Sequence, residues 1–147
     1  MTNRILRGMT PITGFVPYIH VRDVLASQAF YERFGLVLDS RFGEDGAPYW
    51  ARMKAPNCDL MLASCDAPVD PRTQGALFYL YHPDVAAFRS QLLEAGLADG
   101  GAYSGATEDD FPRSGKVFAV QNPFYMPEGE IRVHDPDGYV LLVGQLG

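Results

Sequence analysis

The sequence lacks several features that would place it in common classes of protein. No apolar run approaches the ~20 residues that a membrane-spanning helix needs, and residues 1–10 contain no apolar segment typical of a secretory signal. Basic residues do not cluster and the formal net charge is −6, which disfavours a nucleic-acid partner. We therefore expect a cytoplasmic protein that binds neither membranes nor nucleic acid.

Cysteine is scarce, and the common catalytic motifs do not occur. The two cysteines, Cys58 and Cys65, have a spacing that matches no zinc site and favours free thiols over a disulfide. The sequence has no Gly-x-Ser-x-Gly elbow, no phosphate-binding loop and no dinucleotide fingerprint. The motifs therefore predict no cofactor and indicate no nucleophile.

The chain does contain enough apolar material for one compact domain. Its 147 residues are 47% apolar and 20% charged, which is typical of a globular protein and not of a disordered one. We expect a flexible arm at residues 1–10 and a single domain at residues 11–147. The acidic balance is explained first by solubility, and a cationic small molecule is the alternative reading.

A repeat with an offset of 61 residues is the strongest pattern in the chain. In each copy an aspartate suits a helix N-cap, and a glycine suits the position after the helix end. Apolar residues recur at helical spacing between these two ends. The chain therefore reads as two units of similar structure, at about residues 11–65 and 75–147. The aspartate–glycine pairs are Asp23 with Gly35, and Asp84 with Gly96.

Strands are expected on both sides of each helix. The first unit reads as strand, helix and three strands, with a break at 43–48 and a turn at Pro56–Asn57. The second unit is less regular because a polar segment at 104–114 interrupts it, and Asp135-Pro136-Asp137-Gly138 signals a closing hairpin. The expected strands are 15–21, 36–42, 49–53, 59–63, 76–81, 130–134 and 139–143, with a shorter one within 97–103; the segment 116–121 is either a short strand or an ordered part of the loop. The expected helices are 24–34 and 85–95.

The order of these elements resembles the vicinal-oxygen-chelate superfamily, which includes glyoxalases, bleomycin-resistance proteins and extradiol dioxygenases. The resemblance rests on the segments Ile19–Val24, Ser27–Tyr31 and Asp135–Tyr139, and it covers nearly the whole chain beyond Pro11. It implies an α+β fold in which two βαβββ units form a cupped sheet around a cleft. It also implies a homodimer, because many such chains dimerise.

Apolar residues stand at the positions where metal-dependent relatives hold their metal. Those relatives place a His or Glu on the first strand of each unit, seven residues before the strand-ending Asp, and a Glu on the last strand. The matching positions here are Val16, Ala63, Leu77 and Leu142. None of these side chains has a donor atom for a divalent ion, so the resemblance implies the metal-free, bleomycin-resistance-like branch.

Strand alternation gives the residues expected to line the cleft, because side chains two positions apart share a face. The resulting set is apolar and aromatic, as in many small-molecule sites, and suits a planar or cationic ligand. Aromatic residues on strands equally belong to cores or dimer interfaces. The candidate ligand-binding residues from alternation are Tyr18, His20, Tyr79, Tyr81 and Leu142. Trp50, whose face the pattern leaves undetermined, and Phe124 and Tyr125, which lie next to the final hairpin, complete the set.

Two acidic groups have open interpretations. Glu128 and Glu130 are either a handle for a cation or a charge pair on an edge strand. The run Glu108, Asp109 and Asp110 is either a solvated loop or a lid over the cleft.

These features favour a metal-free binding protein that sequesters a small aromatic or cationic compound, such as an antibiotic. The alternative is an enzyme: a glyoxalase-like isomerase or lyase, a dioxygenase or a thiol transferase, each of which needs the metal. A metal-independent enzyme with His20 as the general base also stays open, as does a structural dimer without a ligand. The sequence leaves open whether the cleft lies in one chain or across a dimer.

Overall fold

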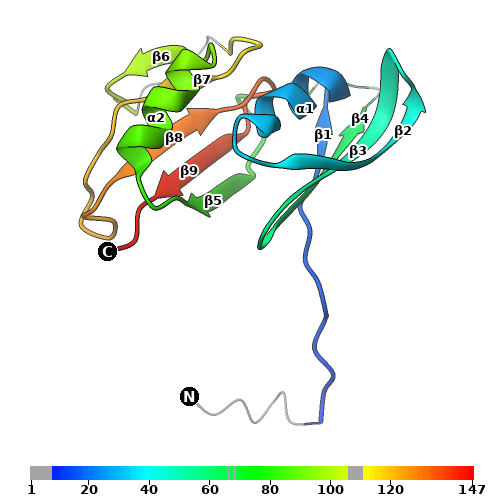
Figure 1. The fold of residues 1–147 in the computed structure, drawn as a ribbon, viewed down its shortest axis with the longest axis horizontal. Helices are drawn as coiled ribbons and strands as arrows, with labels where there is room; N and C mark the ends of the chain where they lie inside the picture. The colour runs from blue at the N-terminus through cyan, green and yellow to red at the C-terminus, as the bar shows by residue number, and fades with distance from the viewer. Residues whose placement is uncertain (1–7, 66, 68, 106–110) are drawn as a thin grey trace.

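Two β-sheets, one from each unit of the repeat, form the framework of the molecule (Figure 1). The computed structural model describes residues 8–65, 67, 69–105 and 111–147. The first unit consists of β1 (Tyr18–Val21), α1 (Val24–Glu32), β2 (Val37–Glu44), β3 (Ala47–Ala55) and β4 (Cys58–Ser64). The second consists of β5 (Leu77–Tyr81), α2 (Val85–Glu94), β6 (Ala98–Gly101), β7 (Lys116–Phe118), β8 (Glu130–His134) and β9 (Val140–Gly144).

The strand order confirms the predicted α+β fold of two βαβββ-like units. The first sheet has the order β1-β4-β3-β2 and the second has the order β5-β9-β8-β7-β6. In both, the first strand of the unit pairs in parallel with the last strand. Tyr18 lies opposite Met61 and Tyr79 lies opposite Leu142, so the 61-residue offset between the two tyrosines reflects equivalent places in the sheets.

Both helices begin at the predicted aspartates. The Asp23 carboxylate accepts hydrogen bonds from the amides of Leu25 (3.0 Å) and Ala26 (3.3 Å), and the Asp84 carboxylate accepts one from the amide of Ala87 (3.0 Å). Each bond satisfies an amide that has no partner within its own helix. Past the helix ends, Gly35 and Gly96 have φ of +84° and +103°, the left-handed backbone that glycine adopts without strain.

Two strand predictions need correction. β1 starts at Tyr18 and not at Phe15, since Pro17 has no amide to donate to the ladder. The expected break at 43–48 is reduced to the Asp45-Gly46 turn between β2 and β3, because this dipeptide suits a two-residue hairpin. The segment 116–121 contributes the short strand β7, which pairs between β6 and β8 in the five-stranded second sheet.

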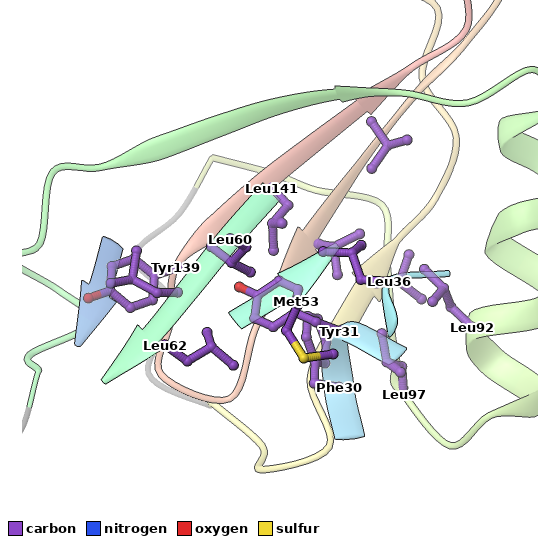
Figure 2. Packing of buried hydrophobic residues seen from close by; sticks show 14 of the residues in the cluster. Phe30, Tyr31, Leu36, Met53, Leu60, Leu62, Leu92, Leu97, Tyr139 and Leu141 are labelled. Carbon is purple, nitrogen blue, oxygen red and sulfur yellow. The ribbon is translucent and has the colours of Figure 1, made fainter. Parts of the chain in front are cut away.

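Residues of both units share one hydrophobic core (Figure 2). Phe30 of α1 and Leu92 of α2 are fully buried together with Met53, Leu62 and Ile131 from the two sheets. Burial of large apolar side chains is the main source of folding free energy. The covered faces of both sheets are thereby committed to the core, and their other faces remain open.

The Asp135–Gly138 hairpin turn is buried against the first unit, which the sequence did not indicate. Asp135 and Asp137 are 0% and 1% exposed. The Asp135 carboxylate accepts bonds from the amides of Asp137 (2.9 Å) and Tyr139 (2.8 Å) and from the hydroxyl of Tyr31 in α1 (2.7 Å). The turn that closes the second sheet therefore also anchors α1.

Asp137 makes the second connection between the units. Its carboxylate accepts hydrogen bonds from the Arg22 amide (2.9 Å), the Arg22 Nε (3.1 Å) and the Ser27 hydroxyl (3.4 Å). The Arg22 guanidinium also donates to the carbonyl of Pro136. Buried charges are tolerated when they are paired and hydrogen-bonded. These contacts of Asp137 and Pro136 with Arg22 and Ser27, here called the joint between the units, fix the second unit against the end of β1.

The described helices are short, and none combines the length and apolar character needed to cross a membrane. Of the predicted arm, residues 1–7 lie outside the described part of the chain. Residues 8–14 run away from the rest of the molecule in Figure 1. They carry two exposed apolar side chains, those of Met9 and Ile12.

Candidate functional site

The open face of the first sheet carries three of the predicted ligand-binding residues. The pairings of Trp50 and His20 with Ala63 place Tyr18, His20 and Trp50 on one face. Trp50 stacks on Phe42 with ring centroids 5.3 Å apart, and Tyr18 packs edge-on to His20 at 6.2 Å. The sequence left the face of Trp50 undetermined, and the strand register resolves it.

A bidentate ion pair occupies the same face. Arg52 Nε and Nη2 donate to the two oxygens of Asp59 at 2.9 and 2.6 Å. The hydrogen bond from Arg52 lowers the pKa of the Asp59 carboxyl below its ordinary value. Asp59 is therefore ionised at neutral pH and already has a cationic partner.

The open face of the second sheet carries Leu77, Tyr79 and Tyr81 from β5, together with Leu142 from β9. Leu77 is 50% exposed and Tyr81 is 62% exposed. The rings of Tyr79 and Tyr81 lie 5.4 Å apart. This face therefore presents a strip of apolar and aromatic side chains to solvent.

A pocket of about 170 Å³ opens on this face, over β7, β8 and β9. Its most buried charged group is Glu130, which is 6% exposed. The hydroxyls of Tyr79 and Tyr125 both donate to the Glu130 carboxylate, that of Tyr125 at 3.2 Å. The pocket is lined by Tyr103, Phe118, Ala119, Gln121, Tyr125, Glu130, Arg132 and Leu142.

The two tyrosines that bond to Glu130 stay protonated across the physiological pH range. Burial, with the hydrogen bond to Glu130 next in importance, raises the pKa of Tyr79 well above its ordinary value. The pKa of Tyr125 is raised by the same causes, desolvation first. Both hydroxyls therefore remain donors to Glu130, and their oxygens keep lone pairs for a further partner.

Arg132 forms the other side of the pocket. Its guanidinium lies 4.1 Å from the centroid of the Tyr103 ring, a cation–π contact. Its Nε donates to Nε2 of His134 at 3.0 Å. Within the described ranges Arg132 forms no ion pair.

Two further hollows, of about 360 and 450 Å³, flank the β3–β4 turn between the units. Asn57 of the turn and Cys58 at the start of β4 line both, as do Tyr79 and Leu80 of β5. The walls are mainly apolar. Neither hollow is lined by Tyr18, His20 or Trp50.

The structure thus divides the predicted ligand-binding residues between two faces. Tyr79, Tyr125 and Leu142 gather at the Glu130 pocket, and Tyr81 lies beside Tyr79. The face of the first sheet holds Tyr18, His20 and Trp50. Phe124 is 94% exposed and contacts only the edge of the pocket through the Tyr125 ring, 5.4 Å away. The run Glu108, Asp109 and Asp110 lies outside the described residues.

Sequence reasoning missed Arg132 and Tyr103 and left the role of Glu130 undecided. A signal for Arg132 was present, because Glu130, Arg132 and His134 alternate along one strand and must share a face. No local signal marked Tyr103. It lies beyond β6 and reaches Arg132 through the tertiary fold.

The residues at the expected metal positions do not fit a metal ion. The register makes Met61 the repeat equivalent of Leu142, and Ala63 the equivalent of Gly144. None of these four residues, nor Val16 or Leu77, has a nitrogen, oxygen or thiolate donor in its side chain. Among the described residues, no three His, Cys, Asp or Glu side chains lie close enough to hold an ion together.

The fold is that of antibiotic-binding proteins of known structure. A bleomycin-resistance determinant encoded on the transposon Tn5 superposes with a TM-score of 0.66 at 22% identity, over 91% of this chain and 98% of the other. The bleomycin-binding protein from bleomycin-producing Streptomyces verticillus, complexed with copper(II)-bleomycin, superposes with a TM-score of 0.63 at 17% identity, over 95% of this chain and 100% of the other. An antibiotic-binding protein from Streptomyces sp. CB03234 superposes with a TM-score of 0.57 at 20% identity, over 94% of this chain and 100% of the other.

These similarities confirm the glyoxalase/bleomycin-resistance fold that the sequence predicted. No family model matches the sequence. No curated protein matches it either. The likeness therefore identifies the fold, while the ligand has to be argued from the side chains of this chain.

Proposed function

We propose that the protein is a metal-free binding protein that sequesters a small aromatic or cationic compound on the open faces of its sheets. The observation that carries the proposal is the Glu130 pocket. A carboxylate that is 6% exposed lies there among tyrosine rings on an otherwise solvent-facing sheet. Aromatic walls with a few convergent polar groups are typical of small-molecule sites.

Two further observations support this proposal. The positions that hold a metal in metal-dependent relatives carry hydrocarbon side chains here. Structures of the same fold include proteins described as binding bleomycin and as binding an antibiotic. We therefore favour sequestration of an antibiotic-like compound over metal-dependent catalysis.

Binding can be tested with bleomycin and with ethidium, a planar aromatic cation, after the protein has been treated with a chelator. In calorimetric titrations we expect at least one probe to bind with a dissociation constant of about 10 µM or below. Replacing Tyr81 by alanine should weaken binding about tenfold through lost stacking area. Tyr49→Ala is the matched control, because Tyr49 is similarly exposed but lies on the other face of its sheet.

Two results would contradict the proposal. One is the lack of saturable binding for both probes. The other is binding that disappears after chelation and returns with a divalent cation, which would mean that a metal takes part after all.

We also propose that the protein is a homodimer in which open faces of two chains meet. Tyr18 and Phe42 are each 57% exposed, and Leu77 and Tyr81 are 50% and 62% exposed. Apolar surface of this kind, when it is contiguous, marks interaction sites in stable proteins. If the first sheet of one chain faces the second sheet of the other, Tyr18, His20 and Trp50 of one chain lie near Tyr79 and Tyr81 of its partner. The cleft then lies across the dimer.

The dimer predicts a solution mass of about 32 kDa, twice the 16.2 kDa of one chain, by light scattering after size exclusion. Tyr18→Glu should shift the protein to the monomer, because it buries an unpaired charge in the interface. Tyr49→Glu is the control, since Tyr49 has nearly the same exposure (56% against 57%) on the opposite face. A monomeric wild type, or equal effects of the two substitutions, would exclude this arrangement.

A further inference from the structure

Glu130 and Arg132 are opposite charges on the same face of β8 that do not pair with each other. They occupy alternate positions of the strand, which places their backbones about 6.6 Å apart. Both line the same pocket. No ion pair between them occurs among the described residues, although long charged side chains at this spacing would have the reach to form one.

Other side chains hold the two charges apart. The hydroxyls of Tyr79 and Tyr125 each donate to the Glu130 carboxylate. The guanidinium of Arg132 lies against the Tyr103 ring and donates through Nε to His134. The pocket therefore has an anionic end and a cationic end, each held in place by aromatic residues.

The remaining hydrogen-bonding capacity of each end matches one chemical group. At the anionic end, the Glu130 carboxylate and the oxygens of Tyr79 and Tyr125 supply three acceptors, and an ammonium group has three N–H donors. At the cationic end, the Arg132 guanidinium has further N–H donors beyond its Nε, enough for a bidentate bond to a carboxylate.

We propose that this pocket binds a zwitterion of the α-amino acid type, with the ammonium at Glu130 and the carboxylate at Arg132. Phe118 and Leu142 line the same pocket and provide apolar contact for a side chain. This inference rests on the proposed function, because it names the ligand class of the same site.

The charge balance of the pocket argues against ligands with only one charge. A simple cation bound at Glu130 meets the repulsion of Arg132, and a simple anion at Arg132 meets that of Glu130. A zwitterion satisfies both ends and neutralises both. The inference therefore narrows the expected compounds from cations in general to molecules that carry both charges.

Three probes that share one ring separate these possibilities: L-phenylalanine, 2-phenylethylamine and 3-phenylpropanoate. In calorimetric titrations of the wild-type protein, we expect L-phenylalanine to bind at least tenfold more tightly than either singly charged probe. Equal affinity of L-phenylalanine and one of the singly charged probes would overturn the inference, as would no detectable binding of L-phenylalanine.

Two substitutions assign the ends of the ligand. Glu130→Gln should lower the affinity for L-phenylalanine and 2-phenylethylamine at least tenfold and leave the affinity for 3-phenylpropanoate unchanged or higher. Arg132→Gln should lower the affinity for L-phenylalanine and 3-phenylpropanoate and leave that for 2-phenylethylamine unchanged. Arg33→Gln is the control, because Arg33 lies at the end of α1 and lines none of the three pockets described above, and it should change none of the three affinities.

Circular dichroism of each variant checks that it folds. If Glu130→Gln does not fold, Tyr79→Phe serves in its place, since it removes one acceptor of the ammonium without removing a charge. It should lower the affinity for L-phenylalanine and 2-phenylethylamine but not that for 3-phenylpropanoate. An equal loss of affinity for all three probes would contradict the inference. Binding of bleomycin or ethidium without binding of L-phenylalanine would refute the zwitterion site and leave the proposed function in place.

Discussion

Replacing Asp137 by alanine is expected to lower the free energy of unfolding by about 3 kcal/mol. The Asp137 carboxylate is 1% exposed and accepts three hydrogen bonds from Arg22 and Ser27. Its removal leaves the Arg22 amide and the Ser27 hydroxyl without their acceptor and breaks the ion pair between the two units. The Arg22 side chain is 31% exposed and can regain water, which keeps the loss at the lower end of the range for buried pairs.

Urea unfolding followed by Trp50 fluorescence measures this loss. Asp99→Ala is the control, because Asp99 also pairs with an arginine, Arg89, but its side chain is 56% exposed. Exposed pairs contribute about 1 kcal/mol or less. A loss at Asp137 no larger than that at Asp99 would mean that the joint adds nothing to stability beyond an ordinary surface ion pair.

Neutralising Asp135 is expected to make the protein more stable at pH 8 than the wild type. Burial raises the pKa of the Asp135 carboxyl from 3.8 to about 7, even though the hydrogen bonds from Tyr31 and from the amides of Asp137 and Tyr139 oppose this shift. At pH 8 the folded protein must hold this buried group ionised. Since one pKa unit corresponds to about 1.4 kcal/mol, the ionisation costs the folded state roughly 4 kcal/mol.

The sign of the pH dependence follows from the proton balance. Between pH 3.8 and about 7 the folded state binds the proton of Asp135 more tightly than the unfolded state does. Stability from this group is therefore complete below pH 3.8, falls as the pH rises through that window, and stays low above pH 7. Asp59 acts in the opposite direction, because its pKa is lowered in the folded state.

Asp135→Asn isolates the contribution of this carboxyl. The asparagine keeps an oxygen for the two backbone amides and cannot ionise. Between pH 5 and pH 8 the free energy of unfolding of the wild type, measured with urea, should fall by about 2 to 3 kcal/mol relative to that of Asp135→Asn. All other groups titrate in both proteins, so their contributions cancel in this difference. A difference that is independent of pH would show that Asp135 keeps its ordinary pKa.

Much of the fold could be predicted because it depends on short-range patterns. The helix caps Asp23 and Asp84 and the glycines after each helix depend on residues within one turn. The alternation of side chains on β1, β5 and β9 follows from strand geometry alone. The division of the chain into two units followed from the 61-residue repeat of these local signals.

The candidate site was predicted only in part, because strand alternation gives the face of a residue and not its neighbours. Tyr79 and Leu142 share a face, as strand alternation predicted, but alternation gave no face for Trp50, which the register places with Tyr18 and His20 on the first sheet. The sequence did not indicate which residue Arg132 contacts. In the structure it forms a cation–π contact with Tyr103, which comes from a different part of the second unit.

The sequence by itself determined the two-unit α+β fold and the apolar character of the expected metal positions, since both follow from residue type and spacing along the chain. The tertiary structure decided which polar groups lose contact with water. Asp135 meets Tyr31 across 104 positions of sequence, and Glu130 meets Tyr79 across 51. Burial, charge separation and pKa depend on what is close in space, and the packing of the two units sets those distances.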